Sequence, residues 1–365
     1  MNDNGITDCI VVGGGLLGLL SARTLRHAGA AVTLLERGST CREASWAGGG
    51  ILSPLVPWNY PDAVSDLVSW SQRYYPGLAR ELQDETGIDI ERVQCGLLMP
   101  GVSDDPDIRT WAETHQCRLQ GIDAVQLHTL EPSLAACPGR SILLPDVAQI
   151  RNPRLCRALI SSLREQGVEI HGQTEVTGIV ERGGKILGVK TVQGDFSAGQ
   201  VVIASGAWTS PLLRGTGLDL PVEPVRGQMI QFQAPPGLLK HIVLYQDHYL
   251  IPRLDGLILA GSTLEYVGYD KSTTDEAHDF LARQALKQLP ALSAYKVVRH
   301  WAGLRPGSPE GIPIIDEHPD IKGLFINTGH FRNGVVMAPA SARLLVDRMQ
   351  KHGSFTGYEP YMLDK

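Results

Sequence analysis

The chain has 365 residues, of which 20% are charged and 43% hydrophobic, and its formal net charge is -6 at pH 7. This length allows two domains or one large interleaved domain, and the composition is ordinary for a globular protein. The negative charge gives no reason to expect nucleic acid or an anionic membrane as a partner.

Targeting signals and cysteine patterns are also weak. No apolar run reaches the roughly 18 residues of a membrane span, and the polar start, Met1 to Thr7, lacks the basic region of a signal peptide. The six cysteines include no C-x-x-C pair, so we expect neither a metal site nor a disulfide framework. These features predict a reduced, cytoplasmic protein.

The first forty residues have the pattern of a βαβ unit. Residues 8–12 are an apolar, β-branched run, residues 16–27 have helical composition, and residues 31–35 form a second apolar run. Gly13, Gly15 and Gly18 lie between the first strand and the helix in the order G-x-G-x-x-G, and Glu36 ends the second strand.

These positions suit dinucleotide binding. Gly13 allows a tight turn, Gly15 lets the backbone approach a pyrophosphate, and Gly18 lets the helix pack against the strand. The helix N-terminus offers free N–H groups to phosphates, and Glu36 can accept hydrogen bonds from an adenosine ribose. The alternative is a glycine-rich turn with no ligand, which the strand, helix and acid together disfavour. The sequence therefore predicts a bound dinucleotide.

A second glycine-rich segment follows at residues 42–53, with three consecutive glycines from Gly48 to Gly50. Such backbone suits a loop that lies against a phosphate or a flat ring, although an ordinary flexible loop is the alternative.

The middle of the chain alternates helices and strands. The patterns predict a helix over 62–87 with a break near Pro76, a strand over 95–100, a surface helix over 104–116, a strand–turn region over 123–131, a helix over 153–166 capped by Asn152, and strands over 168–171 and 175–180. Another apolar strand, residues 199–207, ends in Ser205-Gly206-Ala207, small residues that would let its backbone pass under the cofactor.

From residue 222 the pattern changes to strands at 225–232, 241–244, 249–253 and 257–260, typical of an antiparallel sheet, followed by a helix at 273–288 and a strand at 296–304. The last unit is a strand at 323–328, a glycine turn from Gly329 to Gly334, and a helix to about residue 349.

We therefore predict an α/β fold in which a Rossmann-like dinucleotide-binding domain is interleaved with an antiparallel-sheet (α+β) substrate domain. The first domain is expected at 1–85, 146–221 and 300–365, and the second at 86–145 and 222–299.

Several motifs resemble the FAD-dependent amine and amino-acid oxidases of the D-amino-acid oxidase superfamily, and within it the bacterial glycine oxidase family of thiamine biosynthesis. The resemblance covers essentially the whole chain and is carried by residues 11–18, Pro224-Val-Arg-Gly-Gln228, Tyr249-Leu-Ile-Pro-Arg253, Trp301-Ala-Gly-Leu-Arg-Pro306 with Gly311-Ile-Pro313, and Gly329-His-Phe-Arg-Asn-Gly334.

The resemblance implies a substrate site. Arg305 would bind the substrate carboxylate, with Tyr249 donating its hydroxyl to the same group and the carbonyl of Arg332 meeting the amine. A bidentate guanidinium suits this task. Leu264 would lie near the substrate side chain, where glycine oxidases carry a different apolar residue, which leaves glycine, sarcosine and D-alanine open as substrates. The alternatives are a surface ion pair for Arg305 and a core tyrosine for Tyr249.

The resemblance also implies non-covalent FAD, since the cysteine that attaches flavin in sarcosine oxidases would lie in the C-terminal part and this chain has none after Cys156. Val176 would hold the adenine, Ser45, Gly48 and Gly49 would line the pyrophosphate and the flavin, and the turn at Gly329–Gly334 would meet the flavin N1–C2=O edge. The full set of expected FAD contacts is Gly13, Gly14, Gly15, Leu16, Leu17, Gly18, Glu36, Arg37, Ser45, Gly48, Gly49, Val176, Ser205, Gly206, Trp208, His330, Arg332, Asn333, Gly334 and Val335.

The implied reaction is oxidative deamination by hydride transfer from the substrate Cα to flavin N5, after which the imine hydrolyses to glyoxylate or is handed to a thiazole-forming partner, and O2 is reduced to H2O2. Orientation by Tyr249, Arg305 and Arg332 would dominate catalysis. His248 and His330 are candidate bases but are better read as structural residues. The family also implies a homotetramer.

The alternatives are a D-amino-acid dehydrogenase or sarcosine-oxidase-like enzyme of the same fold, a non-catalytic dinucleotide-binding module, and the oxidase domain of a tRNA-modifying fusion. The absence of a basic composition disfavours the last of these.

Overall fold

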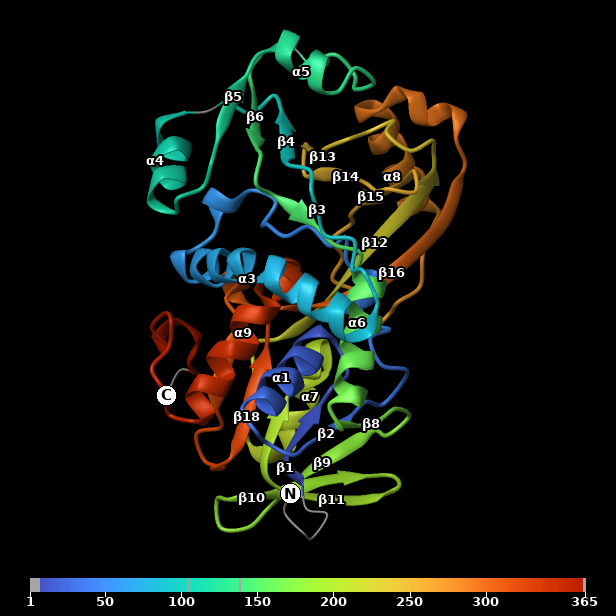
Figure 1. Ribbon diagram of the computed structural model, residues 1–365. Coiled ribbons are helices and arrows are strands. Elements are labelled where there is room, and N and C mark those ends of the chain that lie inside the picture. The colour runs from blue at the N-terminus through green and yellow to red at the C-terminus, as the bar shows by residue number, and fades with distance from the viewer. Residues whose placement is uncertain (1–6, 104, 138, 364–365) are drawn as a thin grey trace.

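The computed structural model describes residues 7–103, 105–137 and 139–363. The chain forms two lobes, each built on a large sheet, and the long helix α3 (Asp62–Thr86) runs between them (Figure 1). The predicted fold class is confirmed, because one sheet is largely parallel with helices packed on it and the other is largely antiparallel.

The first sheet contains the N-terminal βαβ unit. Strand β1 (Thr7–Val12), helix α1 (Leu16–His27) and strand β2 (Val32–Leu35) fall within one residue of the predicted bounds. The strand order is β17-β18-β11-β1-β2-β8. The strands from β18 (Leu324–Thr328) through β11 (Gly194–Ile203), β1 and β2 to β8 (Glu169–His171) are parallel to one another, and β17 (Ile314–Glu317) is antiparallel to β18 at the edge. All four residues of β2 are buried, as expected for a central parallel strand.

A smaller antiparallel ribbon extends from this sheet, since β10 (Ile186–Thr191) pairs with both β11 and β9 (Val176–Glu181). Helices α1, α3, α6 (Asn152–Glu165) and α9 (Gly334–Met349) contribute to one apolar core that includes Leu19, Leu78, Leu159 and Leu345. The side chains that α1 and α9 bury therefore fix the two glycine turns from which these helices begin.

The second sheet has the order β16-β12-β15-β14-β13-β4-β6-β5. Its strands are antiparallel except where β13 pairs with β4, and they are β4 (Leu97–Pro100), β5 (Gln120–Ile122), β6 (Ser141–Leu144), β12 (Glu223–Gln233), β13 (Ile242–Tyr245), β14 (His248–Pro252), β15 (Leu257–Gly261) and β16 (Val297–Gly307). Helix α8 (Asp275–Gln288) packs on it, and α4 (Pro106–Thr114) and α5 (Ala124–Leu130) lie at its far end (Figure 1).

The predicted domain division stays a prediction. Its two substrate-domain segments do meet in the second sheet through the β13–β4 pair. The boundary at residue 300, however, falls inside β16, which pairs with β12 from Val297 to Gly307. Met1 to Ile6, residues 104 and 138, and the last two residues of the predicted division lie outside the described residues.

Local predictions differ from the structure in several places. Helix α3 continues through Pro76, because buried Tyr75, Leu78 and Leu82 hold both halves against the core. Residues 124–130 are a helix and not a strand–turn region, since Asp123 and Gln126 form a reciprocal capping box. Strand β17 and the short pair β3 (Val93–Gln94) and β7 (Ala148–Gln149) were not predicted.

Asn152 does not cap α6 as predicted. Its Nδ2 donates to the carbonyl oxygens of Ser45 and Gly48, at 2.9 and 3.0 Å, and so holds the second glycine-rich loop. The residue at the cap position is Arg151.

The expectation of no disulfide is wrong for one pair. Cys41, in the loop after β2, is bonded to Cys156 on α6, with 6.1 Å between their Cα atoms. The two residues are 115 positions apart, so no local spacing pattern marks them. Cys9, Cys95 and Cys117 are free thiols.

In the described part of the chain, no helix is both long and apolar enough to cross a bilayer.

Candidate functional site

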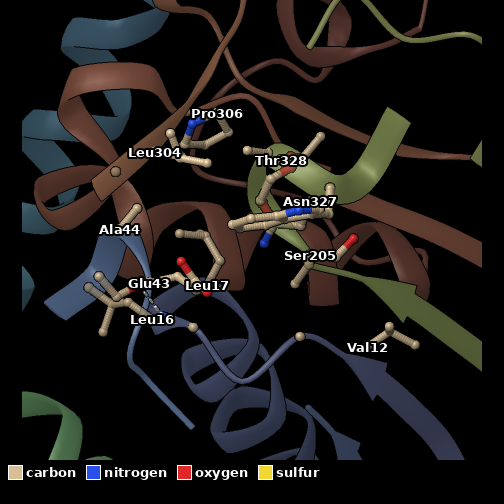
Figure 2. A pocket seen from close by; sticks show the side chains of 18 of the residues that line it. Val12, Leu16, Leu17, Glu43, Ala44, Ser205, Leu304, Pro306, Asn327 and Thr328 are labelled. Atoms are coloured by element: carbon tan, nitrogen blue, oxygen red, sulfur yellow. Dashed lines mark hydrogen bonds between the residues drawn. The ribbon is translucent and has the colours of Figure 1, made fainter. Parts of the chain in front are cut away.

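A cavity of about 480 Å³ opens where the strand ends of the first sheet face the second sheet. The first sheet's side of the wall includes the β1–α1 turn, the end of β2 with the loop after it, residues 174–177, the end of β11 with the residues after it, and the β18–α9 turn. Figure 2 shows their side chains round the cavity, with Leu304 and Pro306 of β16 approaching from the second sheet. Ligands commonly bind at such carboxyl ends of parallel strands.

The first glycine turn is packed too closely for side chains. Gly13 has φ +110°, and a Cβ there would lie 2.4 Å from the Ala204 carbonyl oxygen. A Cβ on Gly18 would lie 1.8 Å from the Gly13 carbonyl oxygen. The turn therefore needs glycine at both positions and brings bare backbone to the cavity wall.

The N-terminus of α1 faces the cavity, and the first turn of this helix contains no acidic residue. The backbone N–H of Leu16 donates to Ser45 Oγ at 2.8 Å, and the cap residue is Gly15. The free N–H groups and the helix dipole make this end favourable for phosphate.

Glu36 lies at the end of β2 and lines the same cavity. One carboxylate oxygen accepts from the Gly14 N–H at 2.7 Å and the other from the Gly38 N–H at 2.9 Å. These bonds fix the carboxylate, and each oxygen keeps lone-pair capacity for a hydroxyl donor.

Arg37 and Trp208 form another wall. The guanidinium carbon of Arg37 is 3.7 Å from the centre of the Trp208 ring, and Arg37 also pairs with Glu43 at 3.3 Å. The stacked cation holds the ring in place.

The second glycine turn leads into α9, whose first residues Gly334 and Val335 line the cavity. His330 is buried, its Nε2 is 2.9 Å from Ser341 Oγ, and burial lowers its pKa to about 3. The lowered pKa and the contact with Ser341 favour the structural role preferred from the sequence over a role as a base.

Arg305 projects from β16 at the cavity wall. Its Nη2 donates to Ser262 Oγ at 2.7 Å and its Nη1 to the Thr263 carbonyl at 3.2 Å. The guanidinium lies on the backbone of β12, because a Cβ on Gly227 would come within 2.2 Å of Nη2. These contacts hold the fork in one orientation.

The electrostatic surroundings of Arg305 favour an anion. Burial lowers the pKa of Arg305 and the nearby Arg332 lowers it further, whereas Tyr249 and Glu265 raise it. The Arg332 side chain has no hydrogen-bond or ion-pair partner among the residues that the structure describes. Two guanidinium groups that repel each other beside one cavity would both be stabilised by a bound carboxylate.

Tyr249 is buried in β14 beside this wall. Its hydroxyl lies 3.7 Å from Met229 Sδ, and a Cβ on Gly261 would lie 2.8 Å from the same oxygen. His248, the other candidate base, packs its ring edge-on against Phe280 at 5.0 Å, and burial lowers its pKa.

Most of the predicted cofactor residues line the cavity, namely Gly13, Gly15, Leu16, Leu17, Glu36, Arg37, Ser45, Gly48, Val176, Ser205, Gly206, Trp208, His330, Arg332, Gly334 and Val335, together with Arg305 from the predicted substrate site. Six predicted residues are not part of its lining, namely Gly14, Gly18, Gly49, Asn333, Tyr249 and Leu264. Gly49 instead packs on Ile251 and Tyr249, and Leu264 is 43% exposed.

Several residues of the lining were not predicted from the sequence, among them Ala44, Thr174, Ala204, Asn327, Thr328, Leu304 and Pro306. Asn327 and Thr328 end a parallel strand, a position that is a usable signal in this fold class. The buried Oδ1 of Asn327 has no partner among the described residues, as expected of a group that meets a ligand.

The donor set fits a dinucleotide and not a metal. The wall offers bare glycine backbone, two helix N-termini, the carboxylate of Glu36 and an unpaired amide oxygen. Within the described ranges, no group of three or more His, Cys, Asp or Glu side chains is placed to hold a metal ion.

Several known proteins are similar to this chain in sequence and in fold. A protein called glycine oxidase from Pseudomonas aeruginosa is 48% identical over 353 residues, covering 96% of this chain and 97% of that protein. The crystal structure of glycine oxidase from Geobacillus kaustophilus superposes with a TM-score of 0.89 at 30% identity, covering 98% of both chains. The bifunctional protein ThiO/ThiG of Trichormus variabilis is 30% identical over 93% of this chain, which spans 52% of that protein.

A family model described as FAD dependent oxidoreductase (DAO) matches residues 8–348, which is nearly the whole chain. The predicted resemblance is thereby confirmed, as is the predicted cofactor. The chain belongs to the DAO family of FAD-dependent oxidoreductases, and FAD is the dinucleotide that its glycine-lined cavity serves.

Proposed function

We propose that this enzyme catalyses the oxidative deamination of glycine, and also of sarcosine and small D-amino acids, with O2 as electron acceptor. The single observation that carries the proposal is the Arg305 fork, which is held by Ser262 and Thr263 at the wall of the FAD cavity. The similarity to proteins called glycine oxidase over nearly the full length supports the same substrate.

In this proposal Arg305 binds the substrate carboxylate through two parallel N–H donors. Tyr249 donates its hydroxyl to the carboxylate, and Arg332 meets the substrate through its carbonyl and adds positive charge. Leu264 borders the substrate side chain. The three polar residues are the proposed catalytic residues, and they act by aiming the Cα–H bond.

Bound FAD supplies the two-electron acceptor, and O2 reoxidises it with formation of H2O2. The chain's own contribution is orientation and charge, because His330 and His248 are held in structural contacts and their pKa values are lowered by burial. We propose that the amine enters neutral, so that no side chain needs to remove its proton.

The cofactor contacts are proposed from the cavity wall. Glu36 would accept from the ribose hydroxyls, the N-terminus of α1 would face the pyrophosphate, and Val176 at the start of β9 would border the adenine. The N-terminus of α9 would stabilise negative charge on the reduced flavin. We propose that FAD is held without a covalent bond, because none of the residues that line the cavity is a cysteine.

The test of the carboxylate site is Arg305→Lys. Lysine keeps the positive charge but cannot donate two parallel hydrogen bonds, so we expect kcat/KM for glycine to fall by about 100-fold or more, at about 1.5–3 kcal/mol for each lost bond to a charged group. The control is Arg343→Lys on the outer face of α9, where Arg343 pairs with Asp347 at 2.9 Å. Equal activity of the two variants would show that Arg305 is not the carboxylate site.

A dehydrogenase or a sarcosine-oxidase-like enzyme of the same fold would share this site and differ in electron acceptor or substrate preference. A non-catalytic module would bind FAD and leave substrate amines unchanged. Turnover under O2, with glycine compared with sarcosine and D-alanine, separates these cases.

Association with other chains is also a proposal. Family resemblance supports a homotetramer, which light scattering would measure. The fused ThiO/ThiG relative is compatible with transfer of the imine to a thiazole-forming partner. The cytoplasmic location stays a prediction, and the Cys41–Cys156 disulfide does not favour it.

A further inference from the structure

The sequence motif Pro224–Gln228 on β12 lies directly beneath the proposed carboxylate site. The Arg305 guanidinium packs directly against the backbone of Gly227. A Cβ added to Gly227 would lie 2.4 Å from the Arg305 Cζ, so a side chain does not fit there. The two neighbours of Gly227, Arg226 and Gln228, are both buried. Neither residue has a role in the proposed reaction. A buried arginine is tolerated only with specific partners, so the partners of Arg226 indicate what it does.

Arg226 uses its donors on the segment that follows β15. Its Nε donates to Glu265 Oε2 at 2.8 Å, and its Nη2 donates to the same oxygen. Its Nη1 donates to Asp270 at 2.6 Å and to the carbonyl of Ser272 at 3.2 Å. The backbones of Arg226 and Glu265 also exchange two hydrogen bonds, of 2.9 and 3.0 Å.

Gln228 also holds the segment after β15, through Thr263 and Glu265. Its N–H donates to Thr263 Oγ1 at 2.8 Å, and its carbonyl accepts from the Thr263 N–H at 3.3 Å. Its Nε2 donates to Glu265 Oε1 at 2.9 Å, and its Oε1 accepts from the Thr274 N–H at 3.0 Å. Both ends of the Gln228 amide are therefore satisfied.

The segment held in this way is the one that holds Arg305. Ser262 Oγ and the Thr263 carbonyl accept the two Arg305 hydrogen bonds, and Glu265 follows two residues later. Glu265 is also the carboxylate whose charge raises the pKa of Arg305 against burial. The contacts thus run from Arg226 and Gln228 through Glu265 to the partners of Arg305.

We propose that Glu265, gripped by Arg226 and Gln228, is a positioning residue that fixes the direction of the Arg305 fork for a substrate carboxylate. This inference rests on the proposed function and deepens it, because it assigns part of the carboxylate affinity to a partly buried cluster that does not touch the substrate. Glu265 is not a catalytic residue in this account.

The test is Glu265→Gln in the FAD-loaded enzyme, with acetate as the probe and calorimetric titration as the readout. Glutamine keeps the shape of the side chain but cannot pair with Arg226 as an anion, so Thr263 and Ser262 are held less firmly. We expect the Kd for acetate to rise about tenfold and FAD content to stay unchanged. KM for glycine should rise in parallel, with kcat within about twofold.

The matched control is Glu81→Gln on α3, which removes a carboxylate 3.3 Å from the buried Arg23 of α1. It should leave the acetate Kd unchanged. Arg226→Lys, which keeps the ion pair but loses the fork, is the milder variant if Glu265→Gln folds poorly, and it should raise the Kd about threefold.

A double-mutant cycle with Arg305→Ala separates positioning from a general structural effect. If Glu265 acts through Arg305, then adding Glu265→Gln to an Arg305→Ala variant should cause no further loss of acetate binding. Equal losses in both backgrounds, or an unchanged Kd in Glu265→Gln and Arg226→Lys, would overturn the proposal. Acetate binding that does not depend on Arg305 in the wild type would also overturn it, since there would be no clamp to position. Because acetate is not oxidised, the cycle can succeed even if glycine turnover fails, which would reject the proposed function alone.

Discussion

At the residue scale, the second glycine turn is anchored by His330, a buried polar side chain. The ring is buried and bonded through Nε2 to Ser341, and burial lowers its pKa to about 3. The unfolded chain gives histidine a pKa near 6.5. Below that pH the unfolded state takes up a proton that the folded state refuses, so this group destabilises the fold progressively from about pH 6.5 down to about pH 3.

We therefore predict that His330→Asn makes the free energy of unfolding less dependent on pH. Relative to the wild type, the variant should gain about 2 kcal/mol between pH 7 and pH 5, at about 1.4 kcal/mol per pH unit below the unfolded pKa. Urea unfolding at both pH values with saturating FAD measures the difference. His128→Asn at an exposed position is the control and should follow the wild type. Parallel pH dependence of all three proteins would show that His330 is not held neutral.

Single residues were the hardest feature to predict from sequence. Glu36 and the glycines of the first turn could be placed, because their spacing follows from the geometry of a βαβ unit. Asn152 could not, since its role depends on two carbonyl groups more than a hundred positions away. Tyr249 and Leu264 were expected beside the substrate, yet neither belongs to the cavity lining, because whether a residue of β14 or of the segment after β15 faces the cavity depends on how the two sheets meet.

At the element scale, the βαβ unit combines a tight turn with an open helix N-terminus. The close approach of Gly18 to the Gly13 carbonyl lets α1 start directly above β1, so that its N–H groups reach the cavity. Any side chain at residue 18 would push the helix away from the strand.

Gly18→Ala should therefore release FAD. A Cβ 1.8 Å from a backbone oxygen cannot be accommodated without moving α1 or the turn, so we expect purified protein with little bound flavin and a Tm lower by several degrees. The ratio of flavin to protein absorbance and a thermal melt measure both effects.

Gly77→Ala in α3 is the matched control, since an added Cβ there meets open space. Alanine favours the helix by about 0.5–1 kcal/mol, so this variant should keep its FAD and melt at the same or a higher temperature. A Gly18→Ala protein with full flavin content would contradict the account of the turn.

The regular elements were predicted well where periodicity alone decides them, as in α1, β2 and α9. Other elements depended on chemistry that periodicity does not report. The capping box at Asp123 turned a predicted strand–turn region into α5, and core packing carried α3 through Pro76. The Cys41–Cys156 disulfide joins the loop after β2 to α6, a proximity that exists only in the folded chain.

At the scale of the whole molecule, the two sheets divide the work of the proposed reaction. The first sheet supplies the FAD cavity from its strand ends, and the second brings Arg305, Leu304 and Pro306 to its wall. Strands β4 to β6 and β12 to β16 are far apart in sequence but form one sheet, so two separate segments of the chain build the proposed substrate side. The antiparallel strands after residue 222 followed from the change of sequence pattern there, whereas the pairing of β13 with β4 and the continuation of β16 past residue 300 did not.

The central claim is that a carboxylate held at Arg305 brings an amine-bearing carbon to FAD. Anaerobic mixing of the FAD-loaded protein with glycine, followed at the long-wavelength flavin band, tests it most directly. We predict prompt loss of the absorbance, and its recovery on admission of air with formation of H2O2. A protein that holds FAD yet keeps its absorbance with glycine, sarcosine and D-alanine alike would contradict the account.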